Sequence, residues 1–458
     1  MFQHFKSIHF IGVCGTVMAS VAVTLKNRGI SVTGSDQKVY PPMSNFLVEQ
    51  GVEVSEGYRK ANLDKSPDLV VIGNAISRGN PEVEAVLERK LRYCSLPELV
   101  NKLFIQGKRS LVITGTHGKT TTASLLAWIL DCNGFNPSYL IGGIPENFSQ
   151  GARFTDSEWI VLEGDEYDTA FFDKRSKFLH YLPEVVLINN LEFDHSDIFN
   201  DLQQIQTSFK RLVNLVPSNG LLLINGDDKN ITPLTDIDHC PIESFTLSHL
   251  NNLEYRQAGA SFVLDGFCFE LPLYGELNVR NALGVICIAR YCGLSNEQIQ
   301  RGFDSFKGIK RRMEVKAEIR GITVVDDFAH HPTAIRETLK AARVRFPGKR
   351  IWAVFEPRSN TTRRNIFQNE LADSLKEAEI IIVSEVARAG KIPRSDLLDT
   401  EKLVHALNDT GRLASCLQSV DNIIEHILGS AEDGDVICIL SNGGFENLHE
   451  RLVRGLKA

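Results

Sequence analysis

Residues 110–122 read SLVITGTHGKTTT, an apolar run followed by a glycine-bearing turn and the polar start of a second segment. The apolar run predicts a strand at residues 110–113, and the pattern that follows predicts a helix at residues 120–132, stopped by Gly134. A strand that feeds directly into a helix opens a β-α-β unit. The stretch therefore predicts a parallel sheet and an α/β fold.

The same alternation occurs on both sides of this stretch. Helices are expected at residues 17–27 and 333–345, and a hairpin with alternating apolar positions is expected at residues 261–273. Further predicted strands are short runs rich in Val, Ile and Leu, at residues 8–11, 30–33, 69–72, 159–162, 185–188, 221–224, 322–325, 351–355, 380–383 and 436–440. Strands alternating with helices favour parallel sheets, with a mixed sheet in the middle of the chain.

A chain of 458 residues is too long for one ordinary hydrophobic core and suits about three domains. The predicted β-α-β rhythm opens at the N-terminus, opens again near residue 108, and returns after Arg311-Arg312. We therefore expect an α/β protein with a Rossmann-like N-terminal domain, a central P-loop ATPase domain with a mixed sheet, and a C-terminal Rossmann-like α/β domain, at residues 1–108, 109–313 and 314–458.

Composition excludes several classes of function. The net charge of -7 and pI near 6.0 make nucleic acid a poor partner. No apolar run approaches the ~20 residues of a membrane helix, and the N-terminus has no export signal, so a cytoplasmic protein is expected. The nine cysteines include no C-x-x-C pair, which disfavours a disulfide framework and a structural zinc site. Nothing in the sequence indicates a particular oligomeric state.

The turn at residues 114–118 has the chemistry of a phosphate-binding loop. Such a loop turns backbone N–H groups and a helix N-terminus toward a phosphate, while Lys119 reaches the β/γ oxygens and Thr120 ligates Mg²⁺. The loop departs from the plain Walker pattern, because Ile113 stands where the first glycine is usual. The alternative is a glycine turn beside a surface lysine.

Two acidic segments follow predicted strands of the same domain, at residues 163–168 and 192–195. Nucleotide chemistry needs acidic groups for the metal, and the carboxyl ends of neighbouring parallel strands are where they are expected. Each segment taken alone could equally be a solvated loop. His195 could be a structural histidine, and His117 could simply pack within the loop.

An N-terminal turn carries an incomplete dinucleotide fingerprint. Gly12 and Gly15 fill the second and third places of G-x-G-x-x-G, but Phe10 occupies the first, and Asp36 ends the next predicted strand. Redox function is therefore weakly indicated. The diphosphate of a nucleotide could rest on this helix start, and a plain packing turn is the alternative.

Several of these motifs occur in the order that resembles the Mur ligases, and the resemblance covers essentially the whole chain. The motifs lie at residues 114–122, 163–168, 194–195, 278–281, 311–312 and 326–332. The resemblance implies an ATP- and Mg²⁺-dependent ligase that forms amide bonds through an acyl phosphate. Its first domain would bind a UDP-sugar, its second ATP, and its third the amino substrate.

The resemblance also implies roles for individual residues. Lys119, Glu163 and His195 would be catalytic, with Thr120, Glu163 and His195 as metal ligands. ATP would be bound by Gly115, Thr116, His117, Gly118, Lys119, Thr120, Thr121, Asn278, Asn281, Arg312 and Asp327. The UDP-sugar would be bound by Gly12, Gly15, Ser35, Asp36 and Asn74. The peptide would be bound by Arg358, Ser359 and Asn360. Arg358 is the candidate for the peptide carboxylates because it follows the predicted strand at residues 351–355, where α/β domains place ligand contacts, and a structural ion pair is the alternative. Asn281 as a helix cap and Arg311-Arg312 as a linker charge pair are the alternatives. Some members carry a carbamylated lysine where this chain has Phe209, so no carbamate is expected.

Further stretches are similar to the branch of the family that joins UDP-N-acetylmuramate to the tripeptide L-alanyl-γ-D-glutamyl-meso-diaminopimelate in cell-wall recycling. They lie at residues 40–44, 73–81, 170–178, 356–361 and 441–445. An L-alanine-adding ligase is the nearest alternative, and a more distant one is folylpolyglutamate synthase, whose folate pocket would not call for the extra N-terminal domain. A P-loop regulator that binds nucleotide without making a bond is an alternative of a different class.

Overall fold

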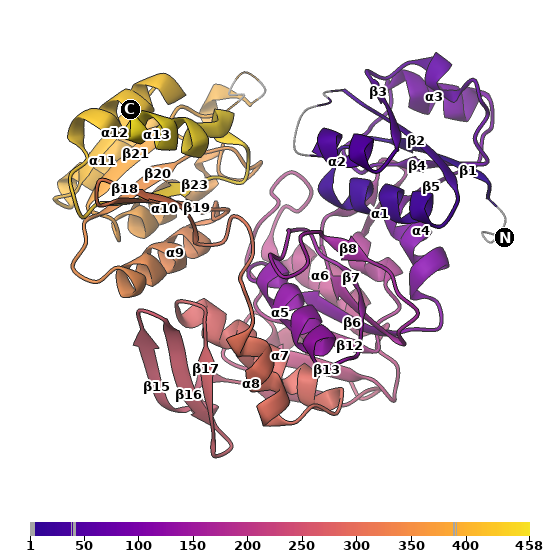
Figure 1. Cartoon of the computed structure of the whole chain (residues 1–458), viewed down its shortest axis with the longest axis horizontal. Helices are drawn as coiled ribbons and strands as arrows, with labels where there is room; N and C mark the ends of the chain where they lie inside the picture. The colour runs from indigo at the N-terminus through magenta and orange to yellow at the C-terminus, as the bar shows by residue number, and fades with distance from the viewer. Residues whose placement is uncertain (1–4, 38, 40–42, 388–389, 391) are drawn as a thin grey trace. The chain divides into compact units, whose positions relative to one another are not determined.

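The chain divides into two compact units in its computed structural model, which describes residues 5–37, 39, 43–387, 390 and 392–458. The first unit comprises Met1–Glu192, Asp201–Leu247 and Asn281–Lys307; the second comprises Phe193–Asn200, Ser248–Arg280 and Gly308–Ala458. Figure 1 shows the N-terminal and central sheets of the first unit in indigo to magenta and the C-terminal sheet of the second in orange to yellow. The three domain boundaries remain a prediction. Residues 40–42 of the stretch at 40–44 lie outside the described residues.

The N-terminal sheet has five parallel strands. In spatial order they are β3 (Glu53–Glu56), β2 (Ser31–Asp36), β1 (Ser7–Ile11), β4 (Leu69–Ile72) and β5 (Tyr93–Ser95). Its helices are α1 (Thr16–Asn27), α2 (Met43–Glu49), α3 (Pro81–Glu88) and α4 (Leu96–Val100). Asn80 caps α3, and Ser95 forms a capping box with Glu98 at the start of α4. The strand order is that of a Rossmann-like half, as the sequence predicts.

The central sheet has seven strands and is mixed, because β8 runs antiparallel to β7. In spatial order they are β14 (Ile242–Phe245), β13 (Leu221–Asn225), β12 (Val185–Ile188), β6 (Arg109–Thr114), β9 (Trp159–Glu163), β7 (Ser138–Leu140) and β8 (Ala152–Arg153). The first unit also contains α5 (Lys119–Cys132), α6 (Leu202–Val213), α8 (Asn296–Asp304) and α7 (Glu276–Tyr291) from residue 281 onward. Ile113 of β6 pairs with Leu187 of β12 and Glu163 of β9, which brings the carboxyl ends of these strands to one edge.

Two antiparallel elements accompany these sheets. In the first unit, β10 (Asp168–Ala170) and β11 (Asp173–Ser176) form a hairpin between β9 and β12 along the chain. In the second unit, β15 (Asn251–Arg256), β16 (Gly259–Leu264) and β17 (Phe267–Leu271) form a three-stranded sheet. The hairpin predicted at residues 261–273 is thus confirmed as β16 and β17.

The C-terminal sheet has six strands, and β18 at its edge is antiparallel to β19. In spatial order they are β18 (Glu314–Ile319), β19 (Ile322–Asp327), β23 (Val436–Leu440), β20 (Ile351–Phe355), β21 (Ile380–Ser384) and β22 (Leu413–Leu417). Its helices are α9 (Pro332–Arg345), α10 (Gln368–Leu375), α11 (Thr400–Asp409), α12 (Val420–Ser430) and α13 (Leu448–Lys457).

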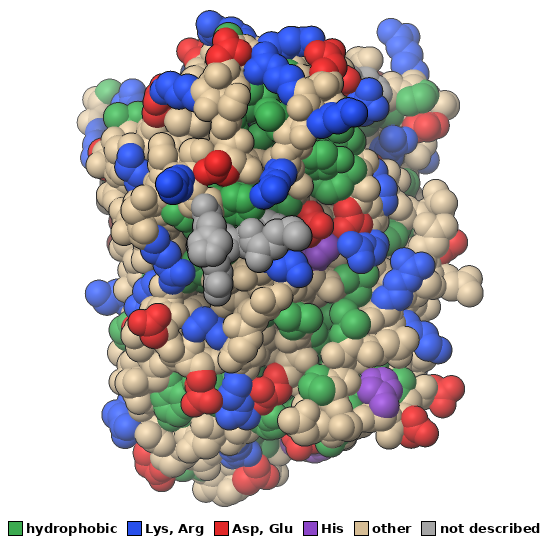
Figure 2. Space-filling view, turned by 90° about the vertical axis from the view of Figure 1, so that its right-hand side faces the viewer, with side chains coloured by type: hydrophobic (Ala, Val, Ile, Leu, Met, Phe, Trp, Pro, Cys, Tyr) green, Lys and Arg blue, Asp and Glu red, His purple; other side chains and the backbone are tan. Residues whose placement is uncertain are grey.

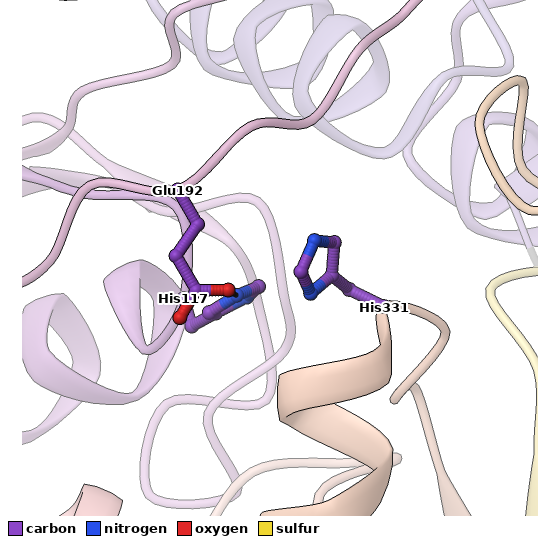
Figure 3. A group of neighbouring side chains, drawn as sticks. All are labelled: His117, Glu192 and His331. Atoms are coloured by element: carbon purple, nitrogen blue, oxygen red, sulfur yellow. Dashed lines mark hydrogen bonds and ion pairs between the residues drawn. The ribbon is translucent and has the colours of Figure 1, made fainter. Parts of the chain in front are cut away.

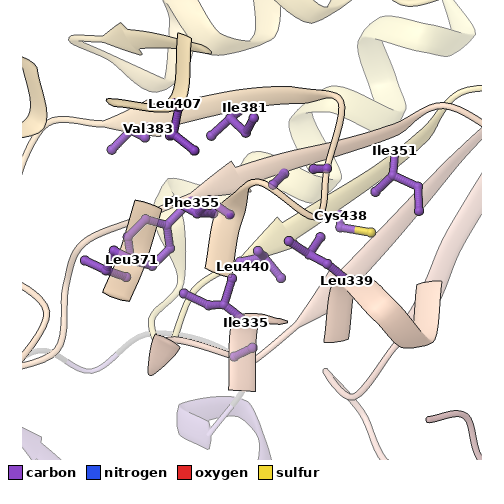
Figure 4. Packing of buried hydrophobic residues seen from close by; sticks show 14 of the residues in the cluster. Ile335, Leu339, Ile351, Phe355, Leu371, Ile381, Val383, Leu407, Cys438 and Leu440 are labelled. Atoms are coloured by element: carbon purple, nitrogen blue, oxygen red, sulfur yellow. The ribbon is translucent and has the colours of Figure 1, made fainter. Parts of the chain in front are cut away.

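Helices cover both faces of this sheet, because its central strands are apolar on both sides. Ile351 and Phe355 of β20 face the core formed with α9, α10 and α11, part of which is drawn in Figure 4. Trp352 and Val354 face the opposite core, formed with α12 and α13. The alternation of a pleated strand thus serves two cores, and the predicted α/β layering is confirmed for this sheet.

The surface is mixed in charge. On the face shown in Figure 2, Lys and Arg side chains are interspersed with Asp and Glu, and among the residues drawn in colour no broad positive area forms. Within the described part of the chain, no helix is both long enough and apolar enough to cross a membrane.

Candidate active site

The loop between β6 and α5 depends on its two glycines. Gly115 has φ +133° and Gly118 has φ +78°, conformations that L side chains rarely adopt. A Cβ on Gly118 would also lie 2.4 Å from Asn281 Oδ1, and one on Gly115 would lie 3.0 Å from the carbonyl oxygen of Asn190. The two glycines therefore hold the loop in a turn at the N-terminus of α5, and the N-terminus of a helix attracts an anion.

Lys119 folds back over this loop. Its Nζ donates to the carbonyl oxygen of Gly115 at 2.6 Å and to both carboxylate oxygens of Glu166, at 2.9 and 3.1 Å. Burial by itself would lower the pKa of Lys119, but the carboxylates of Glu166, Asp165 and Glu163 outweigh it and raise the pKa above its ordinary value. Lys119 is therefore a charged ammonium in a largely buried position.

Thr120 and Glu163 meet across the edge of the sheet. Thr120 Oγ1, in the first turn of α5, donates to Glu163 Oε1 at 2.9 Å, and the backbone N–H of Gly142 donates to Glu163 Oε2 at 2.7 Å. A hydroxyl and a carboxylate are the oxygen ligands that Mg²⁺ prefers. The donor set at this point therefore fits the metal role that the resemblance implies.

The segment after β12 supports the loop from the other side. Asn189 Nδ2 donates to Thr122 Oγ1 at 2.8 Å and to Asn281 Oδ1 at 3.1 Å, while Asn190 Oδ1 accepts from the backbone N–H of His117 at 2.7 Å. Asn281, expected to bind ATP, thus lies against the loop itself. No role was predicted for Asn189 or Asn190, although their place at the end of a strand beside the phosphate loop could have pointed to one.

His117 packs within the loop and contacts an acidic side chain. Its Nε2 lies 3.3 Å from Glu192 Oε2. Figure 3 draws both side chains as sticks. His331, drawn in the same figure, belongs to the second unit, where its side chain caps α9 by accepting from the backbone N–H of Thr333. Thr116 Oγ1 accepts from the N–H of Glu192 at 2.8 Å and so ties the loop to the same segment.

The N-terminal turn is closed by Asp36. Gly12 has φ +86°, and its N–H donates to the carbonyl oxygen of Ser35 at 2.8 Å. Asp36 Oδ2 accepts the N–H of Cys14 at 2.9 Å. Ser35 is buried, and its Oγ donates to Glu82 Oε2 at 2.5 Å, so its hydroxyl helps to fix the residue that accepts the N–H of Gly12. Asp36 and Ser35 thus fix the loop at the N-terminus of α1.

A cavity of about 340 Å³ lies within the first unit, between helices and turns next to the N-terminal sheet and residues of the central sheet and its loops. Gly15 and Asn74, two of the residues expected to bind the UDP-sugar, line it from the turns that follow β1 and β4. Glu163 and Asp165 line it from the central sheet. The cavity therefore joins the turn expected to hold a nucleotide diphosphate to the Thr120–Glu163 pair.

In the second unit, the segment that follows Glu192 meets the loop after β20. Thr361 Oγ1 donates to Asp194 Oδ1 at 2.8 Å, and Asn360 Nδ2 donates to Asp197 Oδ2 at 2.7 Å. Burial raises the pKa of Asp194, but His195, His330 and His331 outweigh it and hold the pKa well below the ordinary value. His195 has φ +55°. The segment that carries His195, expected to bind a metal, thus contacts the loop that carries Asn360, expected to bind the peptide.

Arg312 lies just before β18 of the C-terminal sheet, and Asp327 is the last residue of β19. The Arg312 guanidinium is 5.0 Å from the centre of the Phe328 ring. Asp327 accepts the N–H groups of Met313 and Ala329, and burial raises its pKa although Arg312 opposes the shift.

Asn278 Nδ2 donates to the Tyr274 carbonyl oxygen at 2.8 Å. Asn278 falls in the second unit, whereas Asn281 falls in the first.

Arg358 lies just beyond the carboxyl end of β20. Its Nη1 is 3.2 Å from Glu356 Oε1, and Glu356 is buried and also accepts from Ser441. Its side chain remains 37% exposed, so the guanidinium is available to a ligand. Gly443 borders it closely, because a Cβ there would lie 2.1 Å from Arg358 Nε. Ser359, next along the loop, hydrogen-bonds Thr362 at 2.7 Å.

Three profiles of one family match the chain in sequence. They are the Mur ligase family catalytic domain at residues 7–107, the Mur ligase middle domain at residues 113–289 and the Mur ligase glutamate ligase domain at residues 311–443. The chain belongs to the Mur ligase family. This confirms the family and the three-domain α/β fold expected from the sequence.

This Mur ligase has relatives that match over nearly its full length. The UDP-N-acetylmuramate–L-alanyl-γ-D-glutamyl-meso-2,6-diaminoheptandioate ligase of Escherichia coli is 41% identical, with 98% of each chain covered. The crystal structure of a murein peptide ligase from Psychrobacter arcticus is 36% identical with a TM-score of 0.75, again with 98% of each chain covered. The UDP-N-acetylmuramate–L-alanine ligase of Clostridium acetobutylicum is 31% identical, with 96% of this chain and 95% of that one covered.

Proposed function

We propose that this Mur ligase uses ATP to join the lactyl carboxylate of UDP-N-acetylmuramate to the amine of L-alanyl-γ-D-glutamyl-meso-diaminopimelate, in the cytoplasm. The observation that carries the proposal is the cavity that runs from Gly15 at the start of α1 to Glu163, beside Thr120 and the phosphate loop. It provides one space for a sugar nucleotide whose reactive end reaches the ATP site. The higher identity to the tripeptide ligase than to the alanine ligase supports the choice of amine.

The three domains would divide the work. Residues 1–108 would bind the UDP-sugar through Gly12, Gly15, Ser35, Asp36 and Asn74, with Ser35 acting through its support of the turn. Residues 109–313 would bind ATP on the glycine loop. Residues 314–458 would carry the peptide site, with Arg358 offering a planar fork to one of the carboxylates of the tripeptide.

The chemistry requires an activated carboxylate, because an amide does not form spontaneously from a carboxylate and an amine in water. The lactyl carboxylate oxygen would attack the γ-phosphorus of ATP, releasing ADP and giving an acyl phosphate. The peptide amine would then attack the acyl carbon, and the tetrahedral intermediate would expel phosphate. Lys119, held charged by Glu166, would hold the γ-phosphoryl oxygens during the first step.

One magnesium ion would be held by Thr120 and Glu163, and a second by His195. The fit is best supported at Thr120 and Glu163, where a hydroxyl and a carboxylate oxygen already face each other at 2.9 Å. Bound Mg²⁺ neutralises charge that develops on transferring phosphoryl oxygens. The protein's own contribution is to fix these oxygens, through the Gly142 N–H on Glu163 and the helical start of α5 under Thr120.

Phosphate release with a panel of amines tests the proposal. ADP and phosphate should form only when UDP-N-acetylmuramate, ATP, Mg²⁺ and tripeptide are all present, and kcat/KM for tripeptide should exceed that for L-alanine by at least ~100-fold, about 2.8 kcal/mol of discrimination. Preference for L-alanine would make the chain an alanine-adding ligase. Nucleotide hydrolysis that does not depend on either substrate would indicate a P-loop regulator.

A further inference from the structure

The β10–β11 hairpin connects the two sheets of the first unit. It belongs to the central domain by sequence, but Phe171 at its tip packs against the hydrophobic core of the N-terminal sheet that includes Ile11 and Val83. The neighbouring Phe172 meets Tyr93 of β5 edge to face, with ring centres 5.1 Å apart. This hairpin overlaps residues 170–178, a stretch that the sequence singles out and that the proposed mechanism does not yet use.

Lys177 follows the hairpin directly and lines the cavity. Its Nζ lies 2.5 Å from Asp165 Oδ2, and its backbone N–H donates to the carbonyl oxygen of Tyr167 at 3.1 Å. The side chain is 20% exposed, so its head group is partly shielded from bulk water. An ammonium has three N–H donors, and one bond to Asp165 leaves capacity for a ligand.

The charges around the cavity call for a cation. Glu163 and Asp165 both line it, and among the described residues in its wall Lys177 is the one cation. An anionic carboxylate entering beside two carboxylates would be repelled, and the repulsion grows as water is excluded. Lys119 is paired with Glu166 and is not among the residues that line the cavity. Lys177 is therefore the lining group able to make the reactive end of the cavity accept a negative charge.

We propose that Lys177 binds the lactyl carboxylate of the sugar nucleotide and positions it for attack on the γ-phosphoryl group. The assignment rests on the proposed function. The ion pair with Asp165 orients the ammonium of Lys177. The contacts of Phe171 and Phe172 with the N-terminal part of the chain fix the position of the hairpin, and with it the position of Lys177. The positive charge lowers the free energy of the bound carboxylate, so its main effect falls on binding of the sugar nucleotide.

A pair of sugar nucleotides tests this directly. UDP-N-acetylmuramate carries the lactyl carboxylate, and UDP-N-acetylglucosamine is the same nucleotide without the lactyl ether. Measured by calorimetry without ATP, Lys177→Met should bind UDP-N-acetylmuramate about 10- to 100-fold more weakly, the loss expected for one charge-assisted hydrogen bond. Affinity for UDP-N-acetylglucosamine should stay within about twofold of wild type. Lys177→Arg should retain most of the affinity for UDP-N-acetylmuramate, because it keeps the charge.

Lys174→Met is the matched control. Lys174 lies on the same hairpin and pairs with Asp168 at 2.5 Å, but its side chain is 69% exposed and does not line the cavity. It should leave both affinities unchanged. Lys177→Gln keeps an N–H donor for Asp165 and provides a second variant if Lys177→Met loses stability.

Each remaining outcome has a distinct meaning. Equal weakening toward both nucleotides would overturn the assignment, since Lys177 would then act on the shared UDP part or on the shape of the cavity. Unchanged affinity for both would overturn it as well. If wild-type protein fails to bind UDP-N-acetylmuramate or to release phosphate with it, the proposed function itself fails, and this result is independent of any Lys177 variant.

Discussion

Lys119 and Glu166 form an ion pair next to the phosphate loop. Lys119 Nζ lies 2.9 Å from Glu166 Oε2, and both side chains are largely buried. The pair keeps Lys119 charged and folded against the carbonyl oxygen of Gly115. An incoming γ-phosphate would compete with Glu166 for the same ammonium. The ion pair is therefore expected to affect both the stability of the protein and its activity. Substitutions at the two residues can separate the effect on stability from the effect on activity.

Lys119→Met should lower kcat by about 10²–10³-fold or more, because a positioned cation is lost from the phosphoryl-transfer site. It should also lower Tm, because the variant removes the cation of a buried ion pair with Glu166, at a cost of roughly 3–5 kcal/mol. The double variant Lys119→Met/Glu166→Gln should recover most of the lost Tm without recovering kcat. Near-normal phosphate release in Lys119→Met would remove the lysine from the ATP site.

Glu163→Gln should be nearly inactive at ordinary metal concentration and partly rescued by more Mg²⁺. Loss of one charged oxygen ligand weakens a metal site, and about 1.5–3 kcal/mol corresponds to a 10- to 100-fold higher Mg²⁺ requirement. The measurement is phosphate release as a function of Mg²⁺. Glu158→Gln, an exposed position just before β9, is the control. An unchanged Mg²⁺ dependence in Glu163→Gln would move the ligand role to Asp165 or Glu166.

Arg358→Ala should lower kcat/KM for tripeptide by about 10- to 100-fold while KM for ATP and for the UDP-sugar stays near wild type, because one charge-assisted contact is lost. Measured against tripeptide, dipeptide and L-alanine, the loss should be largest for tripeptide. An equal loss for all three amines would assign Arg358 a role in folding, in agreement with its ion pair to Glu356.

Gly443→Ala offers a test that keeps the arginine. Its Cβ would lie 2.1 Å from Arg358 Nε, so the guanidinium must move, whereas a Cβ on Gly444 would meet nothing within 4 Å. We expect Gly443→Ala to reduce kcat/KM for tripeptide about tenfold, the equivalent of ~1.4 kcal/mol, and Gly444→Ala to leave it unchanged. Identical behaviour of the two alanine variants would show that the position of Arg358 is not important.

Acid should loosen the β10–β11 hairpin. The Arg175 guanidinium lowers the pKa of Asp173 to about 2, from an ordinary value of 3.8. A carboxyl with a depressed native pKa stabilises the fold above its unfolded pKa, and this contribution is lost as pH falls through that value toward the native one. Between about pH 5 and about pH 3, wild type should lose roughly 2–4 °C more in Tm than Asp173→Asn, which corresponds to ~1 kcal/mol after solvent screening.

Exposed Asp236 provides the control for the acid experiment, and Asp236→Asn should follow the wild-type pH profile. If Asp173→Asn also follows the wild-type profile, the carboxylate does not stabilise the hairpin. Affinity for the UDP-sugar should weaken over the same pH range in wild type, because Lys177 directly follows the hairpin.

Apolar strands were the most predictable part of the fold. The predicted strands at residues 185–188, 351–355 and 436–440 agree with β12, β20 and β23 at both ends, because Val- and Ile-rich runs between polar turns have few alternatives. The edge strand β18 and the charged strand β11 were missed. The residues of β11 are largely polar, and β11 becomes a strand through pairing with β10, which a local pattern does not reveal. The residues of β18 alternate between polar and apolar, which is typical of a strand with one exposed face, so β18 could have been predicted.

The phosphate loop was predictable for a similar reason, since its chemistry is local to residues 114–120. The partners of that loop were not. Two of these partners are contacts between segments distant in sequence: Glu166 pairs with Lys119, and Asn189 hydrogen-bonds Asn281. Lys177 likewise lines a cavity together with residues far from it in the sequence. They depend on the order of strands in the sheet, and one sequence alone does not specify which acid or amide faces which lysine.

The bridging hairpin has a consequence for inhibitor design. Because Phe171 anchors a loop of the central domain in the core of the N-terminal sheet, the hairpin joins the two parts of the first unit that line the cavity. A compound that fills it would gain its contacts without the entropic cost of ordering a joint between domains. An anionic fragment linked to an apolar group that reaches Leu96 and Leu140 would suit this cavity, and its affinity should increase with the rigidity of the linker.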